Sequence, residues 1–286
     1  MVCRVRPGGP LKQAMEINVM TVKSLTRSVV IVAVLLFFHL IRAEAQEEEL
    51  RIVHVLVALC DNESQGIVPV SATLGNGDDP VNNLYWGAMY GVKTWFGKDA
   101  EWELISSVSN PRTDVLERCV FKHRRFNVCM IADGYRGSAI KQTHLDFLDE
   151  AAGANNESLV SALPQALRPG ANERSLKLVV YIGHNGLMDF NIAEYPTGKT
   201  GNDRDAIILA CISQKYFSDA LQTGGARPLI WTSGLMAPEA YTLAAALEGW
   251  VRNESAEKIR NRAAEAYNKY QKCGLSAARR LLVSGY

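Results

Sequence analysis

The feature that most constrains the fold is the alternation of short apolar runs with longer amphipathic stretches from Leu50 onward. Most of the runs are continuous stretches of Val, Ile and Leu, which are typical of strands covered on both faces of a sheet. The predicted strands are RIVHVLVAL, WELISSV, FNVCMIA, LKLVVYI, AIILA and PLIW. The predicted helices are PVNNLYWGAMYGVKTWF, SAIKQTHLDFLDEAA, NESLVSALPQAL, SQKYFSDALQ, APEAYTLAAALEGWV and SAEKIRNRAAEAYNKYQK. This order predicts an α/β fold, a mainly parallel six-stranded sheet with helices on both faces in a three-layer sandwich.

The N-terminal residues 1–45 are predicted to lie outside this fold, as an upstream segment and a cleavable signal peptide. Lys23 and Arg27 precede an apolar run at residues 29–41, which is short for a membrane span, and residues 43–45 form a small-x-small cleavage site. An uncleaved anchor is the alternative. We expect residues 46–286 to form a single domain that is secreted or periplasmic, without stable membrane insertion once the signal is removed.

The balance of charge and the cysteine count limit the classes of partner. With 31 basic and 30 acidic residues, the chain has no excess charge that would indicate a nucleic-acid partner. Removing Cys3 with the signal leaves an odd set of cysteines: Cys60, Cys119, Cys129, Cys211 and Cys273. At least one thiol of an exported chain must then stay free or pair with another chain, which makes it a candidate nucleophile. Neither a metal nor a cofactor is predicted, because the sequence has no C-x-x-C motif or His/Cys cluster with zinc spacing.

Two reactive side chains follow consecutive apolar runs. His184 comes after LKLVVYI, and Cys211 comes after AIILA. Ligands of open α/β sheets bind beyond the carboxyl ends of the strands, so neighbouring parallel strands would place both side chains on one edge. An imidazole beside a thiol favours the thiolate and protonates the leaving group. Gly186 and the backbone amide of Cys211 are predicted to form an oxyanion hole. A buried core thiol and a turn histidine are the structural alternatives for the single residues.

A strand that ends in a histidine turn, followed by a strand that ends in Ala-Cys-x-Ser, resembles the caspase–hemoglobinase group of cysteine peptidases. Legumains are the most similar members, because LACISQ is similar to their cysteine segment, and WTSGLMAPEAYTL and NNLYWGAMYG resemble two further segments. The resemblance implies an exported cysteine endopeptidase acting on a peptide or protein substrate through an acyl-enzyme. Cys211 would be the nucleophile, His184 the general acid/base, and Asn83 would orient the imidazole. The turn departs from the family at Asn185, where the family has glycine directly after the histidine.

Two further residues are predicted to bind substrate. Asp61 lies two residues after the first apolar run, where its carboxylate would favour Arg or Lys on the amino side of the cleaved bond. The alternative is that Asp61 caps a turn in the Gly- and Asn-rich loop that it begins, because Asp is common in such turns. The sequence supports the two roles about equally. Ser233 follows the last apolar run.

Other functions remain as alternatives. The first is a catalytically inactive, caspase-like binding or scaffold protein, and the second is a legumain-like transpeptidase, which shares the acyl-enzyme step with a hydrolase. Nucleotide binding is poorly supported because TGKT lacks the leading glycine of a P-loop and Pro80 interrupts the glycine pattern of LGNGDDP. A serine hydrolase is also poorly supported, because Ser233 does not lie in a G-x-S-x-G motif. The sequence predicts no oligomeric state.

Overall fold

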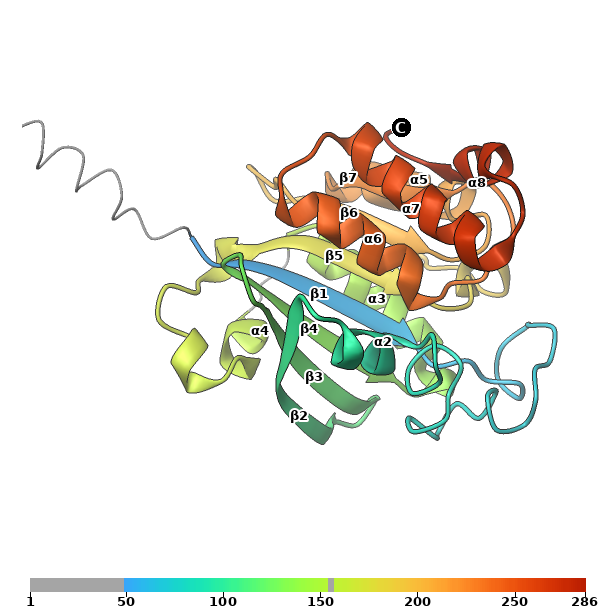
Figure 1. The fold of residues 1–286 in the computed structure, drawn as a ribbon, viewed down its shortest axis with the longest axis horizontal. Helices are drawn as coiled ribbons and strands as arrows, with labels where there is room; N and C mark the ends of the chain where they lie inside the picture. The colour runs from blue at the N-terminus through green and yellow to red at the C-terminus, as the bar shows by residue number, and fades with distance from the viewer. Residues whose placement is uncertain (1–48, 154–156) are drawn as a thin grey trace, which may run out of the picture. The chain divides into compact units, whose positions relative to one another are not determined.

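The computed structural model describes residues 49–153 and 157–286 (Figure 1). The predicted signal peptide, Cys3 included, lies outside these residues. Contacts group residues 49–286 into one unit. Within the described part of the chain, no helix has the length and hydropathy needed to cross a membrane.

The described strands form one mixed sheet in the order β2-β3-β4-β1-β5-β6-β7-β8. Strands β4, β1, β5, β6 and β7 are joined by parallel pairing, whereas the pairs β2–β3, β3–β4 and β7–β8 are antiparallel. The strands are β1 (Arg51–Ala58), β2 (Trp102–Arg112), β3 (Val115–His123), β4 (Val128–Tyr135), β5 (Leu176–Ile182), β6 (Asp205–Leu209), β7 (Arg227–Thr232) and β8 (Leu282–Val283). The predicted α/β class is confirmed. The predicted mainly parallel sheet of six strands was wrong, because the sheet is mixed and has eight strands.

Helices cover both faces of this sheet (Figure 1). Residues of α2, α6, α7 and α8 belong to the apolar core on one face, and residues of α3, α4 and α5 belong to the core on the other. The helices are α2 (Val92–Lys98), α3 (Ile140–Ala151), α4 (Glu157–Ala162), α5 (Ser213–Gly224), α6 (Ala240–Val251), α7 (Ala256–Gln271) and α8 (Leu275–Leu281). This arrangement is compatible with a three-layer sandwich.

Strand β1 shows why the apolar runs are continuous. It lies at the centre of the parallel strands, between β4 and β5. Val53 and Val55 belong to the core under α2, α6 and α7, whereas Ile52 and Leu56 belong to the core under α3 and α5. Alternate side chains of a strand point to opposite faces, so a strand covered on both faces needs apolar residues at nearly every position.

The strand that the sequence pattern missed, β3, carries the buried Glu117 and the partly buried Arg118. The Glu117 carboxylate accepts a hydrogen bond from Trp86 Nε1 at 2.8 Å and one from Lys93 Nζ at 2.6 Å. Arg118 Nε lies 2.6 Å from Asp133 Oδ1 on the adjacent strand β4. These partners compensate the cost of burying the charges, which is why an apolar pattern does not identify the strand.

The segment predicted as the first helix, residues 80–96, is mostly turns, and only its last part belongs to α2. The side chain of Asn83 accepts a hydrogen bond from Cys60 N and donates one to Cys60 O, which satisfies the backbone just beyond β1. A Cβ atom at Gly87 would overlap the carbonyl oxygen of Val81. Hydrogen bonds to residues distant in the sequence and close backbone contacts therefore hold this segment in a series of turns instead of a helix.

Candidate active site

The turns after β5 and β6 lie side by side at the carboxyl edge of the parallel strands. The two strands are parallel neighbours, with Ile182 paired to Leu209 at their ends. His184 follows β5 and Cys211 follows β6. The side chain of Asn185 joins the turns, because its Nδ2 atom donates a hydrogen bond of 2.7 Å to the Cys211 carbonyl oxygen. The structure thus places the predicted nucleophile and base on one edge of the sheet.

The imidazole of His184 is held by a carboxylate that the sequence analysis missed. Its Nε2 atom lies 2.6 Å from Asp189 Oδ2. Asp189 follows the short 3₁₀ turn Gly186–Met188 that begins directly after Asn185. The His184 side chain is 9% exposed and that of Asp189 is 41% exposed. A carboxylate on one ring nitrogen fixes the tautomer and leaves Nδ1 to face a reacting group.

The turn that carries His184 is also held by hydrogen bonds and by close packing against aromatic side chains. The backbone oxygen of His184 accepts hydrogen bonds from the Tyr181 hydroxyl at 2.6 Å and from Gly186 N at 3.1 Å. A Cβ atom at Gly186 would lie 2.6 Å from the ring of Phe190. The fully buried His144 packs against Tyr181 and Phe190. Burial lowers the pKa of His144 to about 4, although the hydrogen bond that His144 Nδ1 donates to the Ile140 carbonyl oxygen opposes this effect, so this second histidine stays neutral.

Cys211 lies in a strained turn at the start of α5. Ile212, the next residue, has φ 50° and ψ 33°, a left-handed conformation that is rare for a β-branched side chain. Ile212 N donates to Gly234 O at 2.8 Å, which holds the turn against the chain after β7. The thiol is partly exposed and sits one residue before the helix cap, Ile212.

The sulfur of Cys211 contacts the backbone of Met236 in the structure. Met236 N lies 3.4 Å from Sγ, and Met236 O lies 3.6 Å from it. Among the described residues, no hydrogen bond joins this sulfur to His184. Catalytic hydrogen bonds are often long or misaligned in proteins without substrate, and a rotation about one side-chain bond moves a thiol between neighbouring partners.

The two predicted oxyanion amides differ in their hydrogen bonding. The Gly186 amide donates to the carbonyl oxygen of His184 within its own turn. The Cys211 amide has no hydrogen-bond acceptor among the residues that the structure describes. The structure therefore leaves the Cys211 amide free to stabilise an oxyanion and engages that of Gly186.

Cys211 differs from the other described cysteines, all of which are also free thiols. Burial raises the pKa of Cys60 to about 11, although a hydrogen bond from Tyr85 opposes part of this effect. Burial raises the pKa of Cys119 to about 12 and also raises that of Cys129. Cys273 is exposed. Among the described cysteines, the accessible thiols are thus those of Cys211 and Cys273.

The remaining predicted site residues have partners elsewhere. The Asp61 carboxylate accepts hydrogen bonds from Glu63 N at 2.9 Å and from the Ser64 hydroxyl at 2.5 Å, both in its own loop. Asn83 is fully buried against the Cys60 backbone instead of orienting the His184 ring. Ser233 is exposed, and its hydroxyl donates to the carbonyl oxygen of Arg280 at 2.8 Å.

Two tyrosines that the sequence analysis did not identify, Tyr85 and Tyr267, lie close enough to the Cys211 thiol to interact with it electrostatically. Burial raises the pKa of Tyr85, and the neighbouring Cys60 and Cys211 add to the effect. Burial also raises the pKa of Tyr267, whose hydroxyl accepts a hydrogen bond from Ala237 N at 3.2 Å. Both phenols stay protonated and can donate hydrogen bonds at this edge.

No group of three or more His, Cys, Asp or Glu side chains within the described ranges is arranged to hold a metal ion. No protein-family model, curated protein or solved structure matches the chain. The resemblance to caspases and legumains therefore stays a prediction that rests on the segments around His184 and Cys211.

Proposed function

We propose that this chain is an exported cysteine endopeptidase in which Cys211 and His184 act as nucleophile and general acid/base. The observation that carries the proposal is the Asn185–Cys211 hydrogen bond of 2.7 Å, because it joins the turn that bears the imidazole to the turn that bears the thiol. Asp189 is added as the residue that positions the imidazole. This combination of nucleophile, base and orienting group is the arrangement that nucleophilic catalysis requires.

The reaction would proceed in two steps, acylation of Cys211 and hydrolysis of the resulting thioester. His184 takes the proton of Cys211, and the thiolate attacks the carbonyl carbon of the peptide bond to form a C–S bond. The C–N bond then breaks, and the leaving amine takes the proton from His184. A water molecule, deprotonated by His184, attacks the carbonyl carbon of the thioester. The C–S bond then breaks, the acid product leaves, and the proton on His184 returns to the Cys211 sulfur. The Cys211 amide donates a hydrogen bond to the oxyanion in both steps.

The transpeptidase reading uses the same first step and replaces water with an amine. The inactive scaffold is favoured by two observations: the Gly186 amide is occupied, and the Cys211 sulfur rests against Met236. These alternatives predict different products from the same protein. A peptidase hydrolyses peptides, a transpeptidase joins them to an added amine, and a scaffold does neither.

The test is digestion of a diverse peptide library by residues 46–286, analysed by mass spectrometry with and without an added amine peptide. We expect cleavage by the wild type and by Cys273→Ser, and none by Cys211→Ala or His184→Gln. Cysteine-dependent products that contain the added amine would establish the transpeptidase instead. If Cys211→Ala retains cleavage, the proposal is wrong. An intact library with a folded wild-type protein would leave the scaffold as the function.

A further inference from the structure

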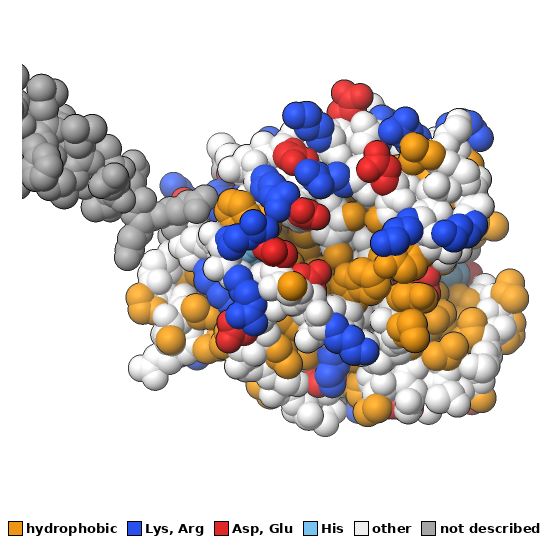
Figure 2. Space-filling model, in the orientation of Figure 1, with side chains coloured by type: hydrophobic (Ala, Val, Ile, Leu, Met, Phe, Trp, Pro, Cys, Tyr) orange, Lys and Arg blue, Asp and Glu red, His pale blue; other side chains and the backbone are white. Residues whose placement is uncertain are grey.

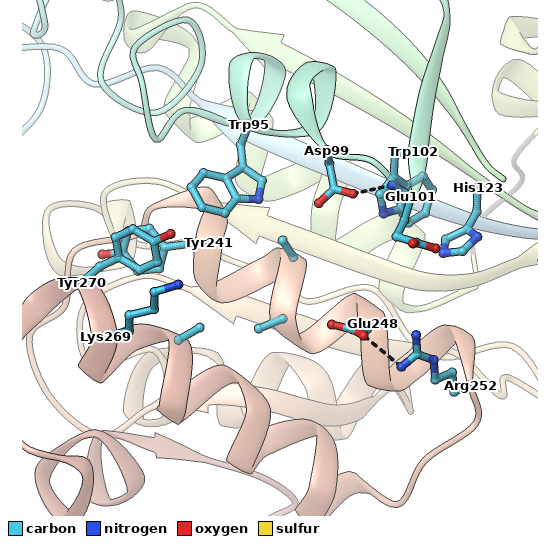
Figure 3. A pocket seen from close by; sticks show the side chains of 13 residues that line it. Trp95, Asp99, Glu101, Trp102, His123, Tyr241, Glu248, Arg252, Lys269 and Tyr270 are labelled. Atoms are coloured by element: carbon cyan, nitrogen blue, oxygen red, sulfur yellow. Dashed lines mark hydrogen bonds and ion pairs between the residues drawn. The ribbon is translucent and has the colours of Figure 1, made fainter. Parts of the chain in front are cut away.

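A hollow lies on the face of the sheet covered by α2, α6 and α7, and it has a volume of about 230 Å³. Figure 3 shows side chains from α2 and the start of β2 on one side of it and from α6 and α7 on the other. The hollow exists because α6 and α7 present alanines there, Ala244, Ala245 and Ala266, where larger residues would close the space. It is lined by none of the residues proposed for catalysis.

Aromatic rings form one wall of the hollow (Figure 3). Tyr241 and Tyr270 stack with their ring centroids 4.2 Å apart, and Trp95 meets the ring of Tyr270 edge to face at 5.7 Å. Trp95 and Tyr270 are partly exposed, whereas Tyr241 is buried behind them. The contacts between the rings fix their orientation, so a ligand finds a rigid apolar surface that needs little ordering.

The opposite wall contains the rings of Trp102 and His123, and charged groups of both signs lie beside them and around the rim. Glu248 is paired with Arg252 at 2.8 Å, and Glu101 is paired with Arg125 at 2.5 Å. Asp99 accepts one hydrogen bond, from Glu101 N, and Lys269 lies over the ring of Tyr270 at 5.4 Å. Figure 2 shows this face, with hydrophobic side chains between groups of blue and red side chains. Because the charges compensate one another, the site does not select for a strongly charged ligand.

We propose that this hollow binds a neutral hexose unit of a glycan. A pyranose has an apolar face of C–H groups that packs on an aromatic ring, and its hydroxyls both donate and accept hydrogen bonds. The wall formed by Trp95 and Tyr270 fits the first feature. The mixed rim of Asp99, Glu248 and Lys269 fits the second. A nucleotide would bring phosphate charge that the rim does not balance, and an apolar peptide side chain would leave the rim groups without partners.

The test measures binding of maltohexaose, cellohexaose and chitohexaose by tryptophan fluorescence and calorimetry. Adenosine and an apolar hexapeptide are measured in the same way, as ligands of the two alternative chemical classes. We expect at least one sugar to bind with a dissociation constant on the order of 10 µM to 1 mM. Trp95→Ala should weaken that binding by at least about tenfold, as expected for the loss of an aromatic platform. Trp95→Phe should retain part of it.

The chain supplies a matched control. Tyr216 on α5 is partly exposed and has Lys215 over its ring at 5.4 Å, as Tyr270 has Lys269, but it packs on the other face of the sheet. Tyr216→Ala should bind the sugar as the wild type does, and Tyr270→Ala should not. Trp95→Ala or Tyr270→Ala could unfold because each loses ring contacts. In that case Ala245→Leu tests the proposal, because the leucine fills the hollow and leaves the rings in place, and this variant should not bind the sugar.

The proposal is overturned if none of the three sugars binds at about 10 mM, well above the expected range. It is also overturned if adenosine or the peptide binds while no sugar does, or if Ala245→Leu binds the sugar as tightly as the wild type. None of these results depends on peptidase activity.

Discussion

The Nε2 atom of His184 lies 2.6 Å from the Oδ2 atom of Asp189, and the two residues are joined by one tight turn. The carboxylate is close to the imidazole but is itself partly exposed, so it orients the ring at little cost in desolvation. The imidazole proposed as the base is therefore held at Nε2 by a carboxylate five residues further along the chain.

Asp189→Asn should lower kcat of the peptidase by roughly tenfold to a hundredfold with little change in KM, because a positioning residue acts on proton transfer. Asp189→Glu should recover part of the lost kcat. The melting temperatures of both variants serve as controls, since the carboxylate is partly exposed. Equal kcat values in wild type and Asp189→Asn would remove Asp189 from the mechanism.

The thiols should differ in reactivity in the native protein. With iodoacetamide at about pH 8, Cys211 and Cys273 should be alkylated, because they are accessible. Cys60, Cys119 and Cys129 should react only after unfolding, because burial raises their pKa values and blocks access. Peptide mapping by mass spectrometry reads each site. Alkylation of Cys60 as fast as that of Cys211 would contradict the structure.

His54 should make stability depend on pH. Its imidazole is buried, 2.6 Å from Glu150 and 3.3 Å from Asp133. Burial alone would lower its pKa, but the two carboxylates outweigh burial and raise the pKa to about 9 from 6.5. Because the folded state holds the proton more tightly, this stabilisation is complete below about pH 6.5 and is lost as the pH rises through 9.

We therefore expect the difference in unfolding free energy between wild type and His54→Gln to shrink by about 3 kcal/mol as the pH rises through this window. Urea unfolding at a series of pH values measures it. His144→Gln is the matched control. Burial lowers the pKa of His144 to about 4, so its effect appears below about pH 6.5 and adds no slope above it. A difference for His54→Gln that does not change with pH would show that His54 is neutral in the folded protein.

The role of Asp61 can be decided by comparing specificity with stability. Because both carboxylate oxygens bond within the loop, we expect Asp61→Asn to lower the unfolding free energy by about 1 kcal/mol. The ratio of cleavage after Arg to cleavage after Asn should stay the same. A fluorogenic peptide panel and thermal unfolding measure the two effects. A loss of Arg preference at unchanged stability would instead place Asp61 in the specificity pocket.

The sequence was most informative about the positions of the strands, most of which are buried on both faces of the sheet. All six apolar runs overlap strands of the sheet, and His184 and Cys211 could be singled out because each lies within two residues of the end of one of them. Strand β3 escaped prediction because it carries Glu117 and Arg118, whose charges are satisfied by Lys93 and by Asp133 of the adjacent strand. The two-residue strand β8 is too short to produce a pattern.

Side-chain partners were predictable only in part. Asp189 has no signal of its own, because an Asp in a loop after a glycine turn is ordinary, and only the fold of the turn directs it to the imidazole. Asn83 was assigned to the imidazole by resemblance, but it satisfies the backbone of Cys60. An apolar pattern locates strand ends, whereas it contains no information on which polar groups meet there.

The most direct test of the proposed dyad is labelling with a peptidyl acyloxymethyl ketone, followed by intact-mass and peptide analysis. The account predicts a single adduct at Cys211 that competes with substrate peptides. His184→Gln should slow its formation by at least about a hundredfold, in line with the loss of a general base. Cys273→Ser should be labelled as the wild type is. Labelling of Cys273 alone, or labelling of Cys211 at the same rate in His184→Gln, would contradict a Cys211–His184 dyad.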